Sequence, residues 1–262
     1  KDVVKEVLDG LSQLRSREDT ERLRGVDLGM SEVEEMENKV WQQMRVIEYF
    51  NQTPVIQFME PLVEADDVIS YIKNSSTFSE WQKVIVSADK DFIQLLDDKT
   101  ILHRPIQKEF LNKNSVVEKF NIHPLNFALA RAIAGDASDN LPGVPRVGLG
   151  TVAKRFPFLK EEKTYYLSDI LEECANPDNK QKVYLSVLEN KNLIKENYNI
   201  MQLSSPMLSI QAKQGIDDTF EHYTPHYNQT EMRKLMLRDG AITVSTVDLE
   251  QRFNHIISSF SR

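Results

Sequence analysis

The chain has 262 residues, enough for one large domain or two smaller ones, each able to bury its own hydrophobic core. Its 40% hydrophobic and 27% charged residues are ordinary for a soluble globular protein, and no apolar run approaches the ~20 residues of a membrane-spanning helix. The single cysteine, Cys174, excludes an intramolecular disulfide framework and favours a reducing compartment, the cytoplasm of a cell or of an infected host.

The formal net charge of −8 argues at first sight against a nucleic-acid partner, because phosphate binding usually depends on a surplus of lysine and arginine. Net charge averages over the whole surface, however. If carboxylates converge to hold divalent ions, the negative excess is local and a basic face can lie elsewhere.

The first half of the chain alternates between predicted helices and strands. Ser31 and Glu34 form a capping-box pattern at the start of a helix that we expect to run to about Phe50. Further along we expect a strand at 53–59, a helix at 64–72, a strand at 83–87, a helix start at 91–96 and a strand at 100–104. This alternation predicts an α/β fold with a mainly parallel central sheet flanked by helices, which binds ligands beyond the carboxyl ends of its strands.

After His123 the pattern becomes almost entirely helical. We expect helices at 124–134, 164–173, 179–198, 229–238 and 247–260. The predicted organisation is a highly charged segment at 1–30, an α/β core at 31–134 and a helical C-terminal region at 135–262.

Three groups of acidic residues follow predicted strand exits or lie in the loop near the junction of the two halves. They are Glu64, Asp66 and Asp67; Asp89 and Asp91; and Asp136 and Asp139. If these like charges converge, cations must neutralise them, and oxygen ligands without histidine or cysteine favour magnesium or manganese over zinc. Two such ions ~4 Å apart activate a water and stabilise the leaving oxygen in phosphodiester hydrolysis. Each group alone is also explained as a helix cap or a solvated turn.

The loop that carries Asp136 and Asp139 continues into a hairpin rich in glycine and proline, residues 141–151. Gly143, Gly148 and Gly150 permit close backbone approach and positive φ angles. Such a turn can present backbone amides to a DNA phosphate, with Thr151, Lys154 and Arg155 adding contacts and charge. An ordinary connection between two helices is the alternative.

The stretches "VEADD", "SADKDFIQLL" and "GDASDNLPGVPRVGLGTVAKRF", in this order, resemble the 5′-nuclease family of flap endonucleases, bacterial DNA polymerase I 5′-nuclease domains and bacteriophage RNase H-type exonucleases. The resemblance covers about residues 31–160 well, and the later helices are similar to the phage branch. It implies a PIN-like core and a helix-three-turn-helix motif. It also implies cleavage of DNA flaps and of RNA in RNA–DNA hybrids, for primer removal and flap processing in replication, alongside replication proteins.

The resemblance also implies roles for individual residues. Glu64, Asp66 and Asp89 match ligands of a first Mg²⁺ ion, for which Mn²⁺ can substitute. Asp91, Asp136 and Asp139 match positions of a second ion, and Asp67 matches a supporting acid. The implied DNA contacts are Gly143, Val144, Arg146, Gly148, Gly150, Thr151, Lys154 and Arg155, and the hairpin carbonyls of relatives also bind K⁺.

The sequence departs from the family at its start. Family members begin with a strand that ends in a metal-binding aspartate, and "VLDG" at 7–10 lies instead among residues with helical spacing. We therefore expect that the native N-terminus is missing and that 1–30 belongs to a helical arch or its flank, where arginines contact phosphates or solvate the segment. Two alternatives stay open: a catalytically incomplete DNA-binding module of the same fold, and a metal-binding α/β domain unrelated to DNA.

Overall fold

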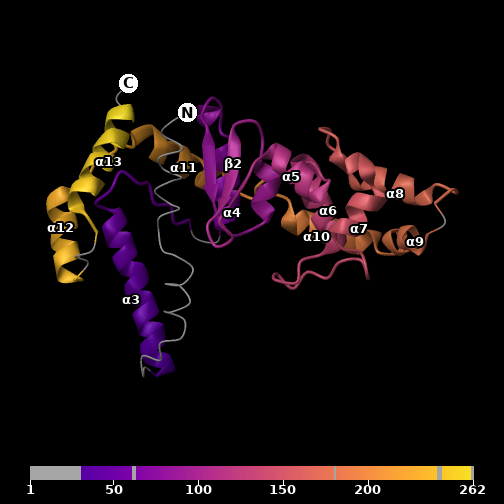
Figure 1. Cartoon of the computed structure of the whole chain (residues 1–262), viewed down its shortest axis with the longest axis horizontal. Helices are drawn as coiled ribbons and strands as arrows, with labels where there is room; N and C mark the ends of the chain where they lie inside the picture. The colour runs from indigo at the N-terminus through magenta and orange to yellow at the C-terminus, as the bar shows by residue number, and fades with distance from the viewer. Residues whose placement is uncertain (1–30, 61–62, 180, 241–243, 261–262) are drawn as a thin grey trace. The chain divides into compact units, whose positions relative to one another are not determined.

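A computed structural model describes residues 31–60, 63–179, 181–240 and 244–260, and these form two compact units (Figure 1). Residues 63–208 make up one, called here the core unit; residues 31–60 and 209–260 make up the other, called here the helical unit. The expectations for 1–30 lie outside the described residues. The expected boundary at 134/135 falls inside the core unit, where helices α6 (Phe127–Ala134) and α7 (Leu149–Arg155) pack against each other on either side of it.

The sheet of the core unit has three strands in the order β1-β2-β3, namely Lys83–Val86, Thr100–Arg104 and Glu109–Leu111. Strands β1 and β2 are parallel, with Ile85 opposite Leu102, and β3 pairs antiparallel to β2. The α/β class and the strands expected at 83–87 and 100–104 are confirmed. The sheet differs from expectation in β3, so that only one of its two pairings is parallel.

The strand expected at 53–59 is wrong. Residues 51–54 form turns and 55–60 have no regular structure. A strand needs a neighbour to accept its main-chain hydrogen bonds, and the part of the chain that the structure describes places none beside this segment. The physical reason is that a short apolar segment can be predicted as extended from its residues, but these residues do not supply the neighbouring strand it needs.

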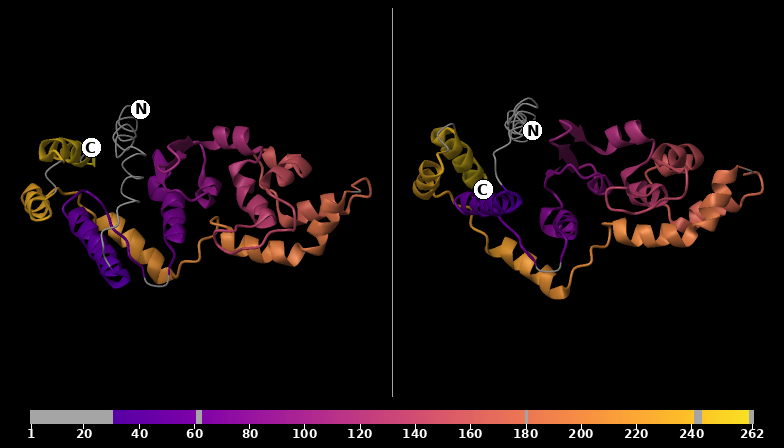
Figure 2. Two further views of the ribbon diagram at one scale, coloured as in Figure 1. Left: turned by 60° about the horizontal axis from the view of Figure 1, so that its bottom comes forward. Right: turned by 90° about the horizontal axis from the view of Figure 1, so that it is seen from below.

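Helices cover the rest of the core unit, with α8 and α9 at the end away from the sheet (Figures 1 and 2). The α-helices not yet given are α4 (Ala65–Asn74), α5 (Lys113–Phe120), α8 (Leu167–Ala175), α9 (Lys182–Glu189) and α10 (Lys191–Met201). The 3₁₀ helices are η1 (Ser76–Phe78), η2 (Asp91–Leu95), η3 (Pro124–Asn126) and η4 (Pro157–Lys160). The single helix expected at 179–198 is instead two helices separated at Asn190, whose Nδ2 donates to the Ser186 carbonyl at 2.7 Å.

The hydrophobic core of this unit is built around α6, whose residues from Phe127 to Ile133 are all buried. Helix α10 packs along α6 and fixes its end through a polar contact. The Asn197 side chain, 2% exposed, donates to the carbonyls of Ala132 at 3.0 Å and Pro142 at 2.9 Å. This amide therefore ties the end of α6 to the hairpin that follows it.

The helical unit contains α3 (Glu32–Phe50), α11 (Ile210–His222), α12 (Gln229–Arg238) and α13 (Thr246–Phe260). The capping box of Ser31 and Glu34 is formed as predicted. Buried Arg45 of α3 donates to the carboxylate of Asp239, just after α12, at 2.8 Å, and the Tyr49 hydroxyl donates to the same carboxylate at 2.9 Å. Within the described ranges, the structure has no helix with both the length and the apolar character to cross a bilayer.

Candidate metal centre and nucleic-acid interface

The first acidic group lies at the start of α4. Glu64 is the N-cap residue, yet its side chain makes no capping hydrogen bond, so capping does not account for this carboxylate. Burial raises the pKa of Asp66, and the neighbouring charges of Asp89 and Glu64 raise it further. Asp67 turns to a different partner, because its Oδ1 accepts the main-chain N–H of Met207 at 3.2 Å.

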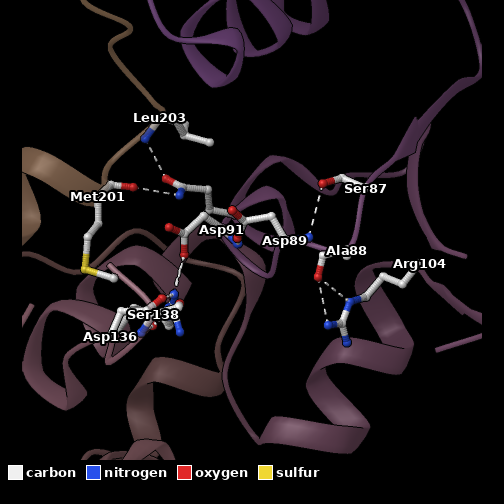
Figure 3. Close-up of polar contacts among 11 residues, drawn as sticks. Ser87, Ala88, Asp89, Asp91, Arg104, Asp136, Ser138, Met201 and Leu203 are labelled. Carbon is white, nitrogen blue, oxygen red and sulfur yellow. Dashed lines mark hydrogen bonds and ion pairs between the residues drawn. The ribbon is translucent and has the colours of Figure 1, made fainter. Parts of the chain in front are cut away.

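The second group lies in the loop that leaves β1, and hydrogen bonds fix this loop residue by residue (Figure 3). The Ser87 hydroxyl accepts the N–H of Asp89 at 3.1 Å, and Asp89 Oδ1 accepts the N–H of Asp91 at 2.8 Å. From β2, Arg104 donates through Nε and Nη2 to the carbonyl of Ala88, at 3.2 and 2.9 Å. Asp91 then begins η2, so both aspartates have defined positions beyond the end of the strand.

The third group lies in a tight turn after α6 that is closed by an isolated β-bridge between Asp136 and Leu141. The main chains of Asp136 and Leu141 exchange hydrogen bonds of 2.8 and 2.7 Å. At the base of the turn, Gly135 has φ +77° and lies so close to Gly143 that a Cβ on it would be 2.2 Å from the Gly143 nitrogen. Asp136 Oδ1 accepts the N–H and hydroxyl of Ser138 at 2.9 and 2.6 Å.

Residues of the second and third groups meet in the core unit. Carboxylate oxygens of Asp91, Asp136 and Asp139 all lie within 4.8 Å of one another, although the residues come from distant parts of the chain. The side chains of Asp91 and Asp136 are only 13% and 11% exposed. The charges of Asp89 and Asp139 both raise the pKa of Asp66, so the Asp66 carboxyl is within electrostatic range of the other two groups. A set of hard oxygen donors of this kind fits a divalent cation such as magnesium or manganese.

Arg131 is a site residue that the sequence analysis missed. It is 8% exposed, and its guanidinium joins the second and third groups: Nη2 is 2.9 Å from Asp91 Oδ1 and also contacts Asp136 Oδ2, while Nε donates to Asp91 Oδ1 at 3.1 Å. Burial raises the pKa of Asp91 to about 6 against the pull of Arg131. For Asp136, burial is outweighed by the Ser138 hydrogen bonds and Arg131, and the pKa is lowered. One feature of the sequence indicates this role: Arg131 is the only charged residue in the otherwise apolar stretch "FALARAIA".

Residues 201–207, which begin with the last residue of α10, form hydrogen bonds with the two elements that carry the first and second acidic groups. The Gln94 side chain of η2 donates to the Met201 carbonyl at 2.9 Å and accepts the N–H of Leu203 at 2.7 Å (Figure 3). The hydroxyl of Ser70, in α4, donates to the Leu203 carbonyl. Together with the contact between Asp67 and Met207, these bonds hold α4 and η2 in place.

The hairpin places its glycines differently from expectation. Gly148 is the N-cap residue of α7 with φ −98°, and neither it nor Gly150 has a positive φ. The positive φ, 64°, belongs to Arg146, which is exposed. Val144, expected to contact DNA, is instead only 2% exposed and packs in the core; its N–H donates to the Ile133 carbonyl and its carbonyl accepts the N–H of Val147. A Cβ on Gly148 or Gly150 would find nothing within 4 Å, which leaves this surface open to close approach.

A groove of about 550 Å³ runs beside the hairpin, between the end of α5, α7 and η4. Lys154 lines it, together with two further lysines that the sequence did not single out, Lys119 and Lys160. Lys119 is already paired with Glu109. Arg155, the neighbour of Lys154, is half-buried.

Comparison with known proteins gives matches over part of the chain. Residues 20–121 match the 5′-3′ exonuclease, N-terminal resolvase-like domain family. The 5′-3′ exonuclease of Buchnera aphidicola subsp. Schizaphis graminum is 37% identical over 101 residues, which is 37% of this chain and 35% of that protein. The 5′-3′ exonuclease of Aquifex aeolicus is 31% identical over 180 residues, 55% of this chain and 62% of that protein. The DNA polymerase I of Mycobacterium bovis is 37% identical over 99 residues, 36% of this chain and 11% of the polymerase. The chain thus spans less than two thirds of each of these relatives.

Solved structures give the same fold over more of the chain. The 5′-exonuclease of bacteriophage T5 with bound zinc ions has a TM-score of 0.58 at 19% identity, covering 83% of this chain and 76% of that one. The bacteriophage T5 flap endonuclease with DNA and metal ions has a TM-score of 0.59 at 19% identity, covering 78% and 75%. These likenesses confirm the predicted fold class, an α/β core with a helical C-terminal region.

Proposed function

We propose that this chain is a structure-specific 5′ nuclease of the 5′-nuclease family, a flap endonuclease and 5′–3′ exonuclease, because its residues 20–121 match the N-terminal domain of 5′-3′ exonucleases. The observation that carries the proposal is the meeting of Asp91, Asp136 and Asp139 within 4.8 Å, inside the unit that also bears the glycine hairpin. A cap or a solvated turn does not require oxygens from η2 and from the turn after α6 to converge.

We propose Mg²⁺ as the metal, with Mn²⁺ as a substitute, because every candidate ligand is a carboxylate oxygen. Glu64, Asp66 and Asp89 would hold one ion, and Asp91, Asp136 and Asp139 the other. When bound, the two ions supply an activated water and charge stabilisation at the leaving oxygen of a phosphodiester. The protein's own part is positioning: the Ser87 hydroxyl accepts the main-chain N–H of Asp89 and fixes its loop, and the N–H of Ser138 donates to the Asp136 carboxylate and orients it.

The substrate in this proposal is DNA with a 5′ flap or a single-strand/duplex junction, or an RNA–DNA hybrid, processed during primer removal. Open main chain at Gly148 and Gly150 lets a sugar-phosphate strand approach closely, and Lys154 supplies charge beside it. Thr151 and Arg146 would add contacts, and K⁺ would bind the hairpin carbonyls. Support comes from the T5 flap endonuclease, whose structure contains DNA, and from the named exonucleases and DNA polymerase I.

A cleavage assay tests the catalytic proposal. The 262-residue protein is incubated with a labelled 5′-flap duplex and Mg²⁺, beside Asp89→Asn and the control Asp98→Asn, an exposed acid of the same unit paired with Lys113. We expect cleavage by the wild type and the control, and a fall of at least ~100-fold in Asp89→Asn, because a lost metal ligand removes several kcal/mol of transition-state stabilisation. Equal rates in all three proteins, or none in the wild type, would contradict the proposal. DNA binding without hydrolysis would assign the chain to the alternative, a catalytically incomplete DNA-binding module.

Binding is tested separately by fluorescence anisotropy at several salt concentrations in EDTA. Lys154→Ala should weaken DNA affinity and reduce the slope of log K against log salt by about one, as expected for a lost phosphate contact. Lys195→Ala, an exposed lysine of α10 on the same unit, is the matched control and should change neither quantity. If the two variants have the same DNA affinity and the same salt dependence, the surface around Lys154 is not part of the DNA interface.

A further inference from the structure

We infer that Arg131 is a positioning residue that acts as an internal counter-ion, holding the place of a divalent cation between Asp91 and Asp136 in the DNA-free protein. The guanidinium and an entering metal ion then compete for the same two carboxylates. This inference rests on the proposed function, since it concerns how the same acidic site is loaded.

The guanidinium of Arg131 contacts two carboxylates of the acidic cluster. One nitrogen, Nη2, contacts both Asp91 Oδ1 and Asp136 Oδ2, and these two residues also contribute oxygens to the cluster that spans 4.8 Å. Nε adds a second bond to Asp91, at 3.1 Å. The arginine thus binds the carboxylates where a bridging cation would bind them.

Arg131 lies among buried residues. Its neighbours Ala130 and Ala132 are 0% exposed, and the residue lies in the middle of a helix that is buried on all sides. The guanidinium therefore has little freedom to leave for solvent. A divalent ion that binds Asp91 and Asp136 meets a positive charge at contact distance, and the two repel each other strongly in a poorly solvated site.

The other carboxylates of the site differ from Asp91 and Asp136 in their ion pairing. Among the residues that the structure describes, Glu64, Asp66, Asp89 and Asp139 form no ion pair with lysine or arginine. Charge compensation is therefore uneven: the single positive charge of Arg131 offsets half of the charge of Asp91 and Asp136, whereas the other four carboxylates have no basic partner among the described residues. We expect the uncompensated carboxylates to bind a first ion readily, and the ion at Asp91 and Asp136 to bind more weakly because it must displace a guanidinium contact.

Mn²⁺ binding to the DNA-free 262-residue protein, followed by calorimetry and by electron paramagnetic resonance of free Mn²⁺, tests this. In Arg131→Gln the weaker Mn²⁺ site should tighten at least about tenfold, because a positive charge at contact distance opposes a cation by more than that factor even under strong screening. Arg131→Lys keeps the charge and should stay close to the wild type. Unchanged or weaker Mn²⁺ binding in Arg131→Gln would overturn the inference. If that result came with normal flap cleavage by the wild type, the proposed function would stand; no Mn²⁺ binding by the wild type would defeat both.

A second measurement on the wild type covers the case in which Arg131→Gln does not fold. The Nε–Hε resonance of Arg131, identified by its absence in Arg131→Lys, is followed during titration with diamagnetic Mg²⁺. We expect it to shift as the guanidinium loses a carboxylate contact at the concentration that fills the weaker site. A resonance that stays fixed through saturation would refute the competition.

Discussion

A methyl group at Gly143 should break the turn that carries Asp136 and Asp139. On the observed backbone, the Cβ of Gly143→Ala would lie 2.1 Å from the carbonyl oxygen of Ala134 and 2.6 Å from the nitrogen of Gly135. These are main-chain atoms, so no rotamer change relieves the overlap. Ordinary contact begins at 3.4 Å, and the two chain segments must therefore separate by more than an ångström.

That separation would strain or break the hydrogen bond from the N–H of Val144 to the Ile133 carbonyl, 2.8 Å long, and loosen the Asp136–Leu141 bridge beside it. Overpacking costs about 1–3 kcal/mol, and each lost main-chain bond about 1 kcal/mol more. We therefore expect Gly143→Ala to lower the free energy of unfolding by about 2–5 kcal/mol, measured by urea denaturation at an unchanged m-value. Mn²⁺ affinity should fall as well, because Asp136 moves relative to Asp91.

Gly150→Ala is the matched control from the same hairpin. Its Cβ would meet no atom within 4 Å, and it lies in the first turn of α7. Alanine favours a helix over glycine by up to about 1 kcal/mol, so this variant should be as stable as the wild type or slightly more stable. If Gly143→Ala unfolds within about 0.5 kcal/mol of the wild type, a change typical of a neutral surface substitution, the close approach at the base of the turn is not a constraint.

Two further predictions concern buried polar contacts in each unit. Asn197→Ala should lower the free energy of unfolding by about 2–3 kcal/mol in urea denaturation, because it leaves the Ala132 and Pro142 carbonyls without their donor; a loss below about 0.5 kcal/mol would contradict this. In the helical unit, hydrogen bonds from Arg45 and Tyr49 hold the pKa of Asp239 below its usual value. The ionised Asp239 carboxylate therefore stabilises the fold fully above about pH 4, the usual pKa of the unfolded chain, and this stabilisation is lost as the pH falls through the lower pKa of the folded state. The difference in melting temperature between wild type and Asp239→Asn should shrink as pH falls from 6 towards that range, and a constant difference would refute the assignment.

Local signals predicted the elements that depend on local contacts. The helix beginning after Ser31 was placed to within a residue because the side chains of Ser31 and Glu34 bond each other's main chain, and helix 229–238 was placed correctly. Elements that depend on a distant partner were harder to predict. The segment 53–59 has the apolar residues of a strand but no neighbouring strand within the described ranges, and β3, with three residues, is too short for any periodicity to reveal.

The same division applies to the candidate site. The acidic residues stand out in the sequence as three compact groups, and the meeting of Asp91 with Asp136 and Asp139 follows from the end of β1 and the turn after α6. Arg131 contacts a residue 40 positions away, and no spacing rule links it to Asp91. Close backbone approach at Gly143 was expected, but its partner, the end of α6, became clear only from the folded chain.

The support of α4 and η2 by residues 201–207 bears on when the protein becomes competent during its synthesis. The bond between Asp67 and Met207 joins residues 140 apart, and that between Gln94 and Leu203 joins residues 109 apart. During translation, the three acidic groups therefore leave the ribosome well before residues 201–207, which bond to α4 and η2. Contacts between residues so far apart in the sequence also form slowly. We expect a chain stalled before Met201 to bind Mn²⁺ poorly, so that metal capture marks the end of translation through the core unit.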